Sequence, residues 1–435
     1  MSCSHITQMR RVPALDGWAP IDVAAHLQHL TDFVFFDTAG NIPHGHRRPL
    51  SMIAARPVEI LKGNLTDRNA CQRLRCALKH GQQLANDQGL PQGGLAGWVS
   101  YEGDFTFGHF PEMLVYCHDH EHWWEIGELS SQLTLPENSA HSYGPEIGDF
   151  HATFSRADFL KKVERIQDWI AKGDIYQVNL SQTYEAPIYG EGSMFGLYEI
   201  LREVTPAPMA AYLRLGGDEV LSSSPETFLR MAGRGIETHP IKGTRPRFQD
   251  VDDDRRSAYE LQTSPKEISE LIMITDLLRN DLGQICEFGS VEVTRMIQLE
   301  SLAHVHHLIS SISGCLRSEI DALGALAACF PGGSITGAPK KRAMEIIDEL
   351  EGKPRGIYCG AIGWLGYQEE SCFNIAIRTI IRHGHKLIYQ VGAGIVADSK
   401  AEHEYEETQH KAAGIRLALE CYHQQRDQGR AGSSR

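Results

Sequence analysis

The sequence predicts a mixed α+β fold built mainly from antiparallel β-sheets. Candidate strands follow one another in neighbouring runs, whereas the strands of a parallel sheet would alternate with helices. Hydrophobic residues make up 42% of the 435 residues, enough for a large core and for two or three domains. Residues 133–150 are rich in Pro, Gly and Ser and separate two differently patterned halves. We therefore expect an N-terminal lobe at 1–145, a main domain at 150–422 and a disordered polar tail at 423–435.

The main domain is expected to begin with a helix and a long strand. Ser155 and Asp158 resemble a capping box, apolar residues recur at helical spacing as far as Ile170, and Gly173 ends the helix. The segment IYQVNLSQTYEA then has the composition of a strand. Further strands are predicted at AAYLRL, EVLSSS, GAIGWLGY, FNIAIRTII and KLIYQVGAG, and helices near 265–282, 339–351 and 399–421.

Composition excludes several classes of protein. The N-terminus MSCSHITQMRRVPALDG lacks the apolar core of a signal peptide, and no run reaches the roughly 18 apolar residues of a membrane span, so we expect a cytoplasmic protein without a membrane partner. Ten cysteines without a CxxC pair indicate free thiols. The net charge of −14 argues against nucleic acid as a partner. An anionic substrate would need a local source of positive charge, such as a metal ion.

Two glycine-rich segments resemble nucleotide-binding motifs only superficially. GAGIVA at 392–397 fits the G-x-G-x-x-A spacing, but it lies too near the C-terminus to open a βαβ unit, and its apolar residues continue a strand. GGSITGAPKK at 332–341 lacks a lysine directly after Gly337, so the G-K-[ST] element is missing. What remains there is a backbone that can approach an anion and offer N–H donors.

Two predicted helices carry acidic residues at helical spacing. Glu267 and Glu270 lie three residues apart on one face of the first helix. Glu404 and Glu407 do the same on the second, along a stripe that continues to Lys411. Charges on an inward-facing stripe are costly unless they are paired or bound to a metal. Two such pairs from distant helices would form the oxygen-rich cage that Mg²⁺ accepts.

Ordinary helix caps explain part of the same pattern. Ser264-x-x-Glu267 is a capping box by itself, and Ser399 with Glu402 is another. Taken singly, each E-x-x-E pair is more often a solvated helix face than a metal site. The residues alone therefore leave both interpretations open.

Nine segments, in order along residues 150–420, together resemble the chorismate-utilising enzymes, a family that includes anthranilate synthase component I, aminodeoxychorismate synthase component I, isochorismate synthase and salicylate synthase. The segments are GDIYQVNLSQ, SSSPETFL, PIKGT, LIMITDLLRNDLG, HHLISSISG, PGGSITGAPK, RGIYCGAIGW, FNIAIRTI and GAGIVADS. FVFFDTAGNIP and LSMIAARPVEIL resemble the family's opening strands. The resemblance implies two large, mainly antiparallel sheets packed as a sandwich with flanking helices, and an N-terminal lobe interleaved with a chorismate-binding catalytic domain.

The resemblance also implies the residues that bind metal and substrate between the sheets. Glu270 and Glu407 match the glutamates that bind Mg²⁺, and Glu267 and Glu404 match the pair that supports the metal and its waters. The groups expected around the enolpyruvyl carboxylate are Tyr358, Arg378 and the backbone of a turn at Gly392 and Gly394. Those expected around the ring carboxylate are Lys411 and the backbone at Gly243 and Thr244. Mg²⁺, Arg and Lys together suit a dianion in an acidic protein.

Two further positions match the family but have ordinary alternatives. His307 matches the active-site histidine near the leaving hydroxyl, although a histidine beside His304 and His306 is otherwise more often structural or solvent-facing. Thr336 lies in the matching pocket-lining loop, where its hydroxyl can equally serve the loop itself.

Lys242 lies in HPIKGTRPR, where two prolines and Gly243 indicate a rigid loop that other groups approach closely. By itself such a lysine is either a solvated charge or a nucleophile fixed by its neighbours. Isochorismate-forming members of the family carry a lysine where this chain has Gln177, and anthranilate synthases typically have PIAGT. PIKGT therefore resembles the aminodeoxychorismate synthase component I branch.

In that branch, the lysine amine is expected to attack carbon 2 of chorismate as the 4-hydroxyl leaves, and ammonia then enters at carbon 4 while the lysine departs. Glu226, in SPE, matches the acid/base that protonates the leaving hydroxyl and manages the incoming amine. The lysine must be unprotonated to attack. The product would be 4-amino-4-deoxychorismate, on the pathway to 4-aminobenzoate and folate.

The ammonia implies a partner. No cysteine stands in a recognisable nucleophile motif of a glutamine amidotransferase, so we expect a separate amidotransferase subunit to supply it. The alternatives are anthranilate synthase component I and, from another class, a non-catalytic subunit that only docks the amidotransferase. So many clustered ionisable groups argue against the second alternative.

Overall fold

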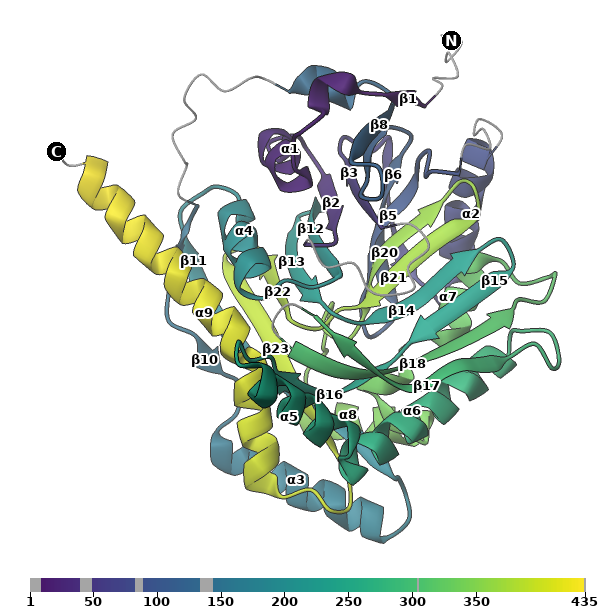
Figure 1. Ribbon diagram of the computed structural model, residues 1–435, viewed down its shortest axis with the longest axis vertical. Helices are drawn as coiled ribbons and strands as arrows, with labels where there is room; N and C mark the ends of the chain where they lie inside the picture. Colours follow the sequence, from purple (N-terminus) through teal and green to yellow (C-terminus); the bar gives the residue numbers. More distant parts are fainter. Residues whose placement is uncertain (1–8, 40–48, 83–88, 134–143, 303–304, 434–435) are drawn as a thin grey trace.

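The computed structural model describes residues 9–39, 49–82, 89–133, 144–302 and 305–433. Two large sheets dominate this part of the chain, one of 13 strands and one of 10, with helices on their outer sides (Figure 1). Every pairing between the named strands is antiparallel. The predicted α+β fold with mainly antiparallel sheets is therefore confirmed.

The first sheet joins strands from both ends of the sequence. Its order is β1 (Arg10–Arg11), β8 (His122–Ile126), β7 (Met113–Cys117), β3 (Leu50–Ala54), β2 (Phe33–Asp37), β12 (Met209–Leu215), β13 (Asp218–Ser224), β22 (Thr379–His383), β23 (Lys386–Ile395), β11 (Gln177–Tyr189) and β10 (His151–Ala152). Two short strands, β9 (Glu146–Ile147) and β19 (Gly337–Ala338), also pair with β11.

The second sheet carries the PIKGT segment at its edge. Its order is β16 (Ile241–Pro246), β18 (Val305–Cys315), β15 (Gly235–His239), β14 (Thr227–Ala232), β21 (Glu370–Ile375), β20 (Ala361–Gly366), β5 (Gly94–Val99), β6 (Asp104–Phe110) and β4 (Glu59–Asn64). β17 (Glu292–Ser301) pairs with β18 as well.

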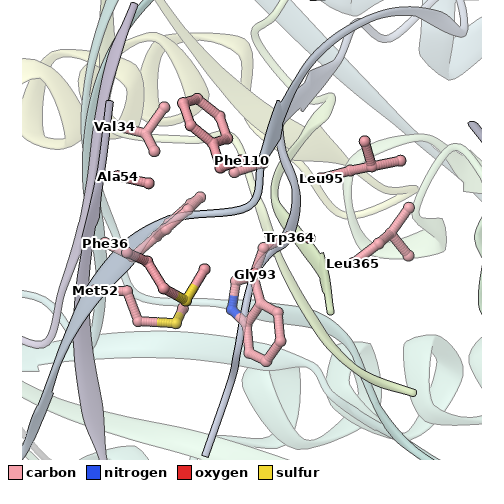
Figure 2. Close-up of a pocket in the computed structure, with 12 residues that line it drawn as sticks. Val34, Phe36, Met52, Ala54, Gly93, Leu95, Phe110, Trp364 and Leu365 are labelled. Atoms are coloured by element: carbon pink, nitrogen blue, oxygen red, sulfur yellow. The ribbon is translucent and has the colours of Figure 1, made fainter. Parts of the chain in front are cut away.

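Residues 9–133 contribute strands to both sheets, so the N-terminal lobe is built into the main fold. Apolar side chains of the two sheets meet between them: Figure 2 shows Phe36 and Met52 of the first sheet beside Trp364 of the second. The small hollow that these residues line has no titratable side chain and serves packing. A cavity of about 580 Å³ adjoins it, and none of the predicted site residues lines that cavity. Of the predicted connector at 133–150, residues 134–143 lie outside the described residues.

The helices cover the outer faces of the sheets. They are α1 (Pro20–Leu27), α2 (Arg68–Gln82), α3 (Arg156–Ala171), α4 (Phe195–Val204), α5 (Val251–Gln262), α6 (Pro265–Gly283), α7 (Ala322–Cys329), α8 (Lys340–Glu351) and α9 (Ala401–Ser433). The capping box predicted at Ser155 and Asp158 is present, because each residue accepts the backbone N–H of the other. Among the described helices, none combines the length and the apolar character that a membrane span requires.

Helix α9 continues through most of the segment that we predicted to be a disordered tail. Residues 423–433 are helical, and Figure 1 shows this end of α9 projecting past the sheet. Tyr422 is buried and donates a hydrogen bond of 2.9 Å to the carbonyl of Pro145, and Arg426 lies 3.7 Å from Glu146. These contacts with residues far away in the sequence anchor the helix, so the prediction from composition was wrong here.

The predicted single strand FNIAIRTII is two strands in different sheets. β21 ends at Ile375 in the second sheet, and β22 begins at Thr379 in the first. The three residues between them carry the chain from one sheet to the other. Arg378 is one of these three residues.

Candidate active site

Two crossings between the sheets lie side by side and carry Glu226 and Arg378. Glu226 follows β13 of the first sheet and precedes β14 of the second, just as Arg378 lies between β21 and β22. The crossings are tied together by backbone hydrogen bonds from Ile375 N–H to the Glu226 carbonyl and from Ser223 N–H to the Arg378 carbonyl, both 3.1 Å. A buried acid and a guanidinium are thus fixed on neighbouring backbone segments.

Arg378 has a guanidinium group that is free to pair with an anionic ligand. Burial lowers the pKa of its guanidinium, and no carboxylate among the described residues forms an ion pair with it. Its backbone has φ of +49°, a left-handed conformation that costs free energy for a residue with a side chain. An unpaired, half-buried guanidinium is expected to bind a carboxylate of a ligand, because charged groups are costly to remove from water without a partner.

Glu226 is a buried acid with a strongly raised pKa. Burial raises the pKa of its carboxyl group to about 7, although a hydrogen bond from Ser334 and the charge of Lys242 lower it in part. At pH 7 the group is therefore protonated roughly half of the time. A carboxyl group with this pKa can act both as an acid and as a base near neutral pH.

His307 presents an unpaired nitrogen. Its Nδ1 lies 3.0 Å from the carbonyl oxygen of Gly243, which can only accept, so Nδ1 carries the proton. Nε2 is then an acceptor, and it is buried with no hydrogen-bond partner among the described residues. Burial, together with the charge of Arg378, lowers the pKa of His307 to about 4, so the ring is neutral at pH 7. It offers one lone pair to an O–H or N–H group. His304, the neighbour noted in the sequence, lies outside the described residues.

Lys242 is held by a bulge in the edge strand β16. The register with β18 shifts between Lys242 and Thr244, and Gly243 occupies the bulge with φ of +67°. A Cβ atom at Gly243 would lie 2.6 Å from Leu261, so only glycine fits. The Lys242 side chain is 15% exposed, and its Nζ lies 4.0 Å from Oε2 of Glu270. Among the described residues, Glu270 is therefore the ion-pair partner of Lys242.

The four predicted metal-site glutamates belong to one electrostatic cluster. Glu267 and Glu270 come from α6, and Glu404 and Glu407 come from α9. All four influence the pKa of a single lysine, Lys266. Helices that are separated by more than 110 residues of sequence thus bring their acidic faces together.

These residues fit a hard divalent cation, although they do not form a finished cage. Among the described residues, no three His, Cys, Asp or Glu side chains are close enough together to make a ready metal site. Glu404, however, is only 2% exposed, and its Oε2 has no hydrogen-bond partner in the described part of the chain. Burying an unpaired carboxylate oxygen is costly, and carboxylate oxygens are the ligands that Mg²⁺ prefers. Binding would require the carboxylates to close around the ion by rotation of their side chains.

The helix caps proposed as alternatives have mixed outcomes. Ser264 does cap α6, accepting the backbone N–H of Glu267 at 3.5 Å. Ser399 instead donates to Oε1 of Glu404 at 2.7 Å, and Glu402 pairs with Arg156. The predicted capping box between Ser399 and Glu402 is therefore wrong, and Ser399 orients a carboxylate of the cluster.

Comparison with known proteins identifies the family. A family profile described as "chorismate binding enzyme" matches residues 41–416. The chain belongs to the chorismate-binding enzyme family. It is a chorismate-utilising enzyme, and the cluster of Arg378, Glu226, His307 and Lys242 is its candidate active site.

The relatives catalyse more than one reaction. Aminodeoxychorismate synthase component 1 of Bacillus subtilis (strain 168) is 39% identical over 367 residues, which cover 76% of this chain and 77% of the relative. Anthranilate synthase component 1 of Methanothermobacter thermautotrophicus is 39% identical over 358 residues, covering 75% and 74%. The crystal structure of anthranilate synthase component I from Streptococcus pneumoniae TIGR4 matches with a TM-score of 0.74 at 30% identity, covering 86% of this chain and 93% of that one. The fold is that of anthranilate synthase component I, and equal identity leaves the reaction open.

The structure corrects one of the remaining family positions, the turn predicted at Gly392 and Gly394. Gly392 and Gly394 are part of β23, paired with β11, and do not form the predicted turn. β22 pairs with β23 only as far as Tyr389, so the other edge of β23 at the two glycines has no strand partner among the described residues. Backbone groups on that edge are available to a ligand. Lys411 donates to the carbonyl of Gly392 at 3.0 Å and lies 2.8 Å from Glu407.

Thr336 and Tyr358 are both buried. The Thr336 hydroxyl donates to the carbonyls of Gly332 and Gly333, at 3.1 and 3.3 Å. This is the local loop role that the sequence left open. Tyr358 lies beside Arg355, whose guanidinium carbon is 6.0 Å from the centre of the tyrosine ring.

Arg355 is buried and links several segments, a role that its place at the start of RGIYCGAIGW does not predict. Its guanidinium pairs with Glu351 of α8 at 2.7 Å. It also donates to the carbonyl of Ile335 at 3.0 Å and to that of Asn179 at 2.8 Å. Arg355 thus contacts the pocket-lining loop, β11 and Tyr358 at the same time. An arginine before a glycine gives no sequence signal of burial, so only the structure reveals this role.

Proposed function

We propose that this enzyme replaces the 4-hydroxyl group of chorismate with an amine, giving 4-amino-4-deoxychorismate on the route to 4-aminobenzoate and folate. The observation that carries the proposal is Lys242, fixed by the bulge of β16 and close enough to Glu226 to lower the pKa of that acid. An amine held beside a carboxyl group that exchanges its proton near neutral pH is what covalent amine catalysis needs.

Chorismate carries two carboxylates, so its binding needs positive charge in a protein of net charge −14. Arg378, which has no ion-pair partner among the described residues, suits the enolpyruvyl carboxylate, together with the buried Tyr358. Lys411 suits the ring carboxylate. Glu270 and Glu407 would hold Mg²⁺, supported by Glu267 and Glu404, and the bound ion would supply charge that neutralises the ring carboxylate.

The reaction proceeds in two displacements. In the first, the unprotonated Lys242 amine forms a bond to carbon 2, the ring double bonds shift, and the C4–O bond breaks. The leaving hydroxyl takes the proton of Glu226 and departs as water. In the second, ammonia forms a bond to carbon 4, the double bonds shift back, and the bond from Lys242 to carbon 2 breaks. Glu226 then accepts a proton from the new ammonium group, so chorismate and ammonia yield the product and water.

His307 is suited to orient the groups at carbon 4. Its neutral Nε2 accepts a hydrogen bond and cannot donate one, because the proton is on Nδ1. The 4-hydroxyl group and the incoming ammonia are both donors. One lone pair can therefore align first the leaving group and then the nucleophile.

The nitrogen source is proposed to be a separate glutamine amidotransferase. Ammonia from solution should support the reaction of this chain alone, whereas glutamine should do so only with the partner present. Production of the amine from glutamine by the purified single chain would contradict this assignment.

Anthranilate synthesis is the second candidate, because an anthranilate synthase component is as similar to this chain as an aminodeoxychorismate synthase component. The test is to incubate the protein with chorismate, Mg²⁺ and ammonium salt and to identify the product by mass spectrometry and chromatography. We expect the product that is aminated at carbon 4 and that retains the enolpyruvyl side chain. Anthranilate would favour the second candidate, and a folded protein without turnover would favour a docking subunit.

A further inference from the structure

Lys266 lies inside the glutamate cluster but has no role in the proposed reaction. Its Nζ is 3.5 Å from Oε1 of Glu404 on α9 and 3.9 Å from Oε1 of Glu270 on its own helix. Burial would lower the pKa of Lys266, but the charges of Glu404, Glu270, Glu407 and Glu267 raise it overall. Lys266 therefore contacts one carboxylate on each helix, whereas Lys411 is the cation beside Glu407.

Helix stability does not explain this lysine. Lys266 is the second residue of α6, where the helix dipole favours acidic residues and disfavours cations. Its spacing from Glu270 is lysine first and glutamate four residues later, the weaker orientation of such a pair. The lysine side chain is also 49% exposed, and half-exposed ion pairs contribute little to stability. The position is unfavourable for α6 itself, so the contact that can explain a lysine here is the one with Glu404 of α9.

The two side chains of this ion pair, Lys266 and Glu404, differ in conformational freedom. Glu404 is 2% exposed and oriented by Ser399, whereas Lys266 is a long side chain with access to solvent. Glu404 keeps one carboxylate oxygen without a hydrogen-bond partner in the described part of the chain. The cluster therefore combines a fixed, incompletely satisfied anion with a cation that can move away.

We propose that Lys266 is a tethered cation that offsets the negative charge of Glu270 and Glu404 while no metal is bound and withdraws toward solvent when a divalent cation enters. This inference rests on the proposed Mg²⁺ site. It makes Lys266 a determinant of metal affinity: the ion must displace an ammonium group, so binding is weaker and exchange easier than the four carboxylates alone would allow. The same lysine protects the metal-free protein from repulsion between carboxylates on α6 and α9.

The test compares metal binding by the wild type, Lys266→Met and Lys266→Arg in the absence of substrate. Free Mn²⁺ is measured by electron paramagnetic resonance, with Mg²⁺ as competitor. Removing one unit charge about 4 Å from a divalent ion should tighten Mn²⁺ binding on the order of thirtyfold even at the dielectric constant of water. Lys266→Arg keeps the charge and can pair with a carboxylate through two hydrogen bonds, so it should bind Mn²⁺ no more tightly than the wild type.

Thermal unfolding supplies a second readout. Without metal, Lys266→Met should melt below the wild type, and saturating Mn²⁺ should raise its melting temperature by more than it raises that of the wild type. Lys341→Met is the matched control, since it removes the same charge from an exposed position on α8. It should change neither quantity.

The outcomes separate this inference from the metal site itself. A wild type that binds no Mn²⁺ overturns the metal site and the inference together. If the wild type binds Mn²⁺ and Lys266→Met binds it equally or more weakly, the site stands and the tethered-cation role is wrong. If Lys266→Met does not fold, Mn²⁺ binding by Lys266→Arg that is tighter than wild type would also overturn the inference.

Discussion

Glu226 gives the reaction a pH dependence whose direction can be predicted. The raised pKa of about 7 means that the acid form predominates below pH 7 and is lost above it. Since departure of the hydroxyl needs the acid form, kcat/KM should fall as pH rises through about 7. The rate must be measured at a constant concentration of free ammonia, because ammonium also titrates in the alkaline range.

Glu226→Gln removes the titrating group, so the alkaline fall should disappear together with about 10²-fold or more of the rate. A variant that keeps both the rate and the alkaline limb would show that the limb belongs to another group.

Lys242 distinguishes covalent catalysis from simple charge. Lys242→Ala should lose most of the amination while retaining chorismate binding, since Arg378 and Lys411 remain. Lys242→Arg keeps the charge but stays protonated, so it should be as inactive as Lys242→Ala. The measurements are steady-state kinetics and a binding titration with chorismate. Near wild-type amination by Lys242→Arg, with no lysine adduct detected in the parent enzyme by mass spectrometry, would contradict the covalent mechanism.

At the scale of elements, the bulge in β16 sets the positions of Lys242 and His307 at the same time. Gly243→Ala forces a side chain into φ of +67° and within 2.6 Å of Leu261. We expect a loss of about 2 kcal/mol in the free energy of unfolding from backbone strain and steric contact. The activation free energy should rise by more than the free energy of unfolding falls, because the Gly243 carbonyl also orients His307.

Gly384→Ala is the matched control for the bulge. Gly384 has a similar φ of +58°, and a Cβ atom there meets nothing within 4 Å. Urea unfolding should show a smaller loss for Gly384→Ala, with normal kinetics. Equal losses of stability and activity in the two variants would mean that the bulge has no special role in the site.

At the scale of the whole molecule, the N-terminal lobe completes both sheets. β2 pairs with β12 in the first sheet, and β5 pairs with β20 in the second. A chain that begins at residue 144 would expose both of these inner strands and the apolar surface between the sheets. We expect it to be insoluble or unfolded, and co-expression of residues 1–143 to restore folding. A soluble, cooperatively folded fragment that binds chorismate would contradict this view.

Much of the local structure follows from the sequence. Ser155 and Ser264 cap the predicted helices because a cap depends on residues three positions apart. The strands of the main domain likewise appear where runs of apolar and β-branched residues predicted them. The prediction failed where contacts between distant residues determine the local structure. One such place is the C-terminal end of α9, which Tyr422 ties to Pro145, and another is the segment 392–394, which pairing with β11 keeps extended.

The sequence by itself determined the α+β class, the caps at Ser155 and Ser264, the acidic helix faces and the motifs that carry the family. Only the tertiary structure decided that FNIAIRTII divides between two sheets, that Arg378 is left without an ion-pair partner among the described residues, and that Lys266 joins glutamates of two helices. The physical reason is the distance along the sequence between the residues that interact. Helix caps and strand alternation depend on neighbours within a few residues, whereas burial, charge pairing and pKa depend on which distant segments pack together.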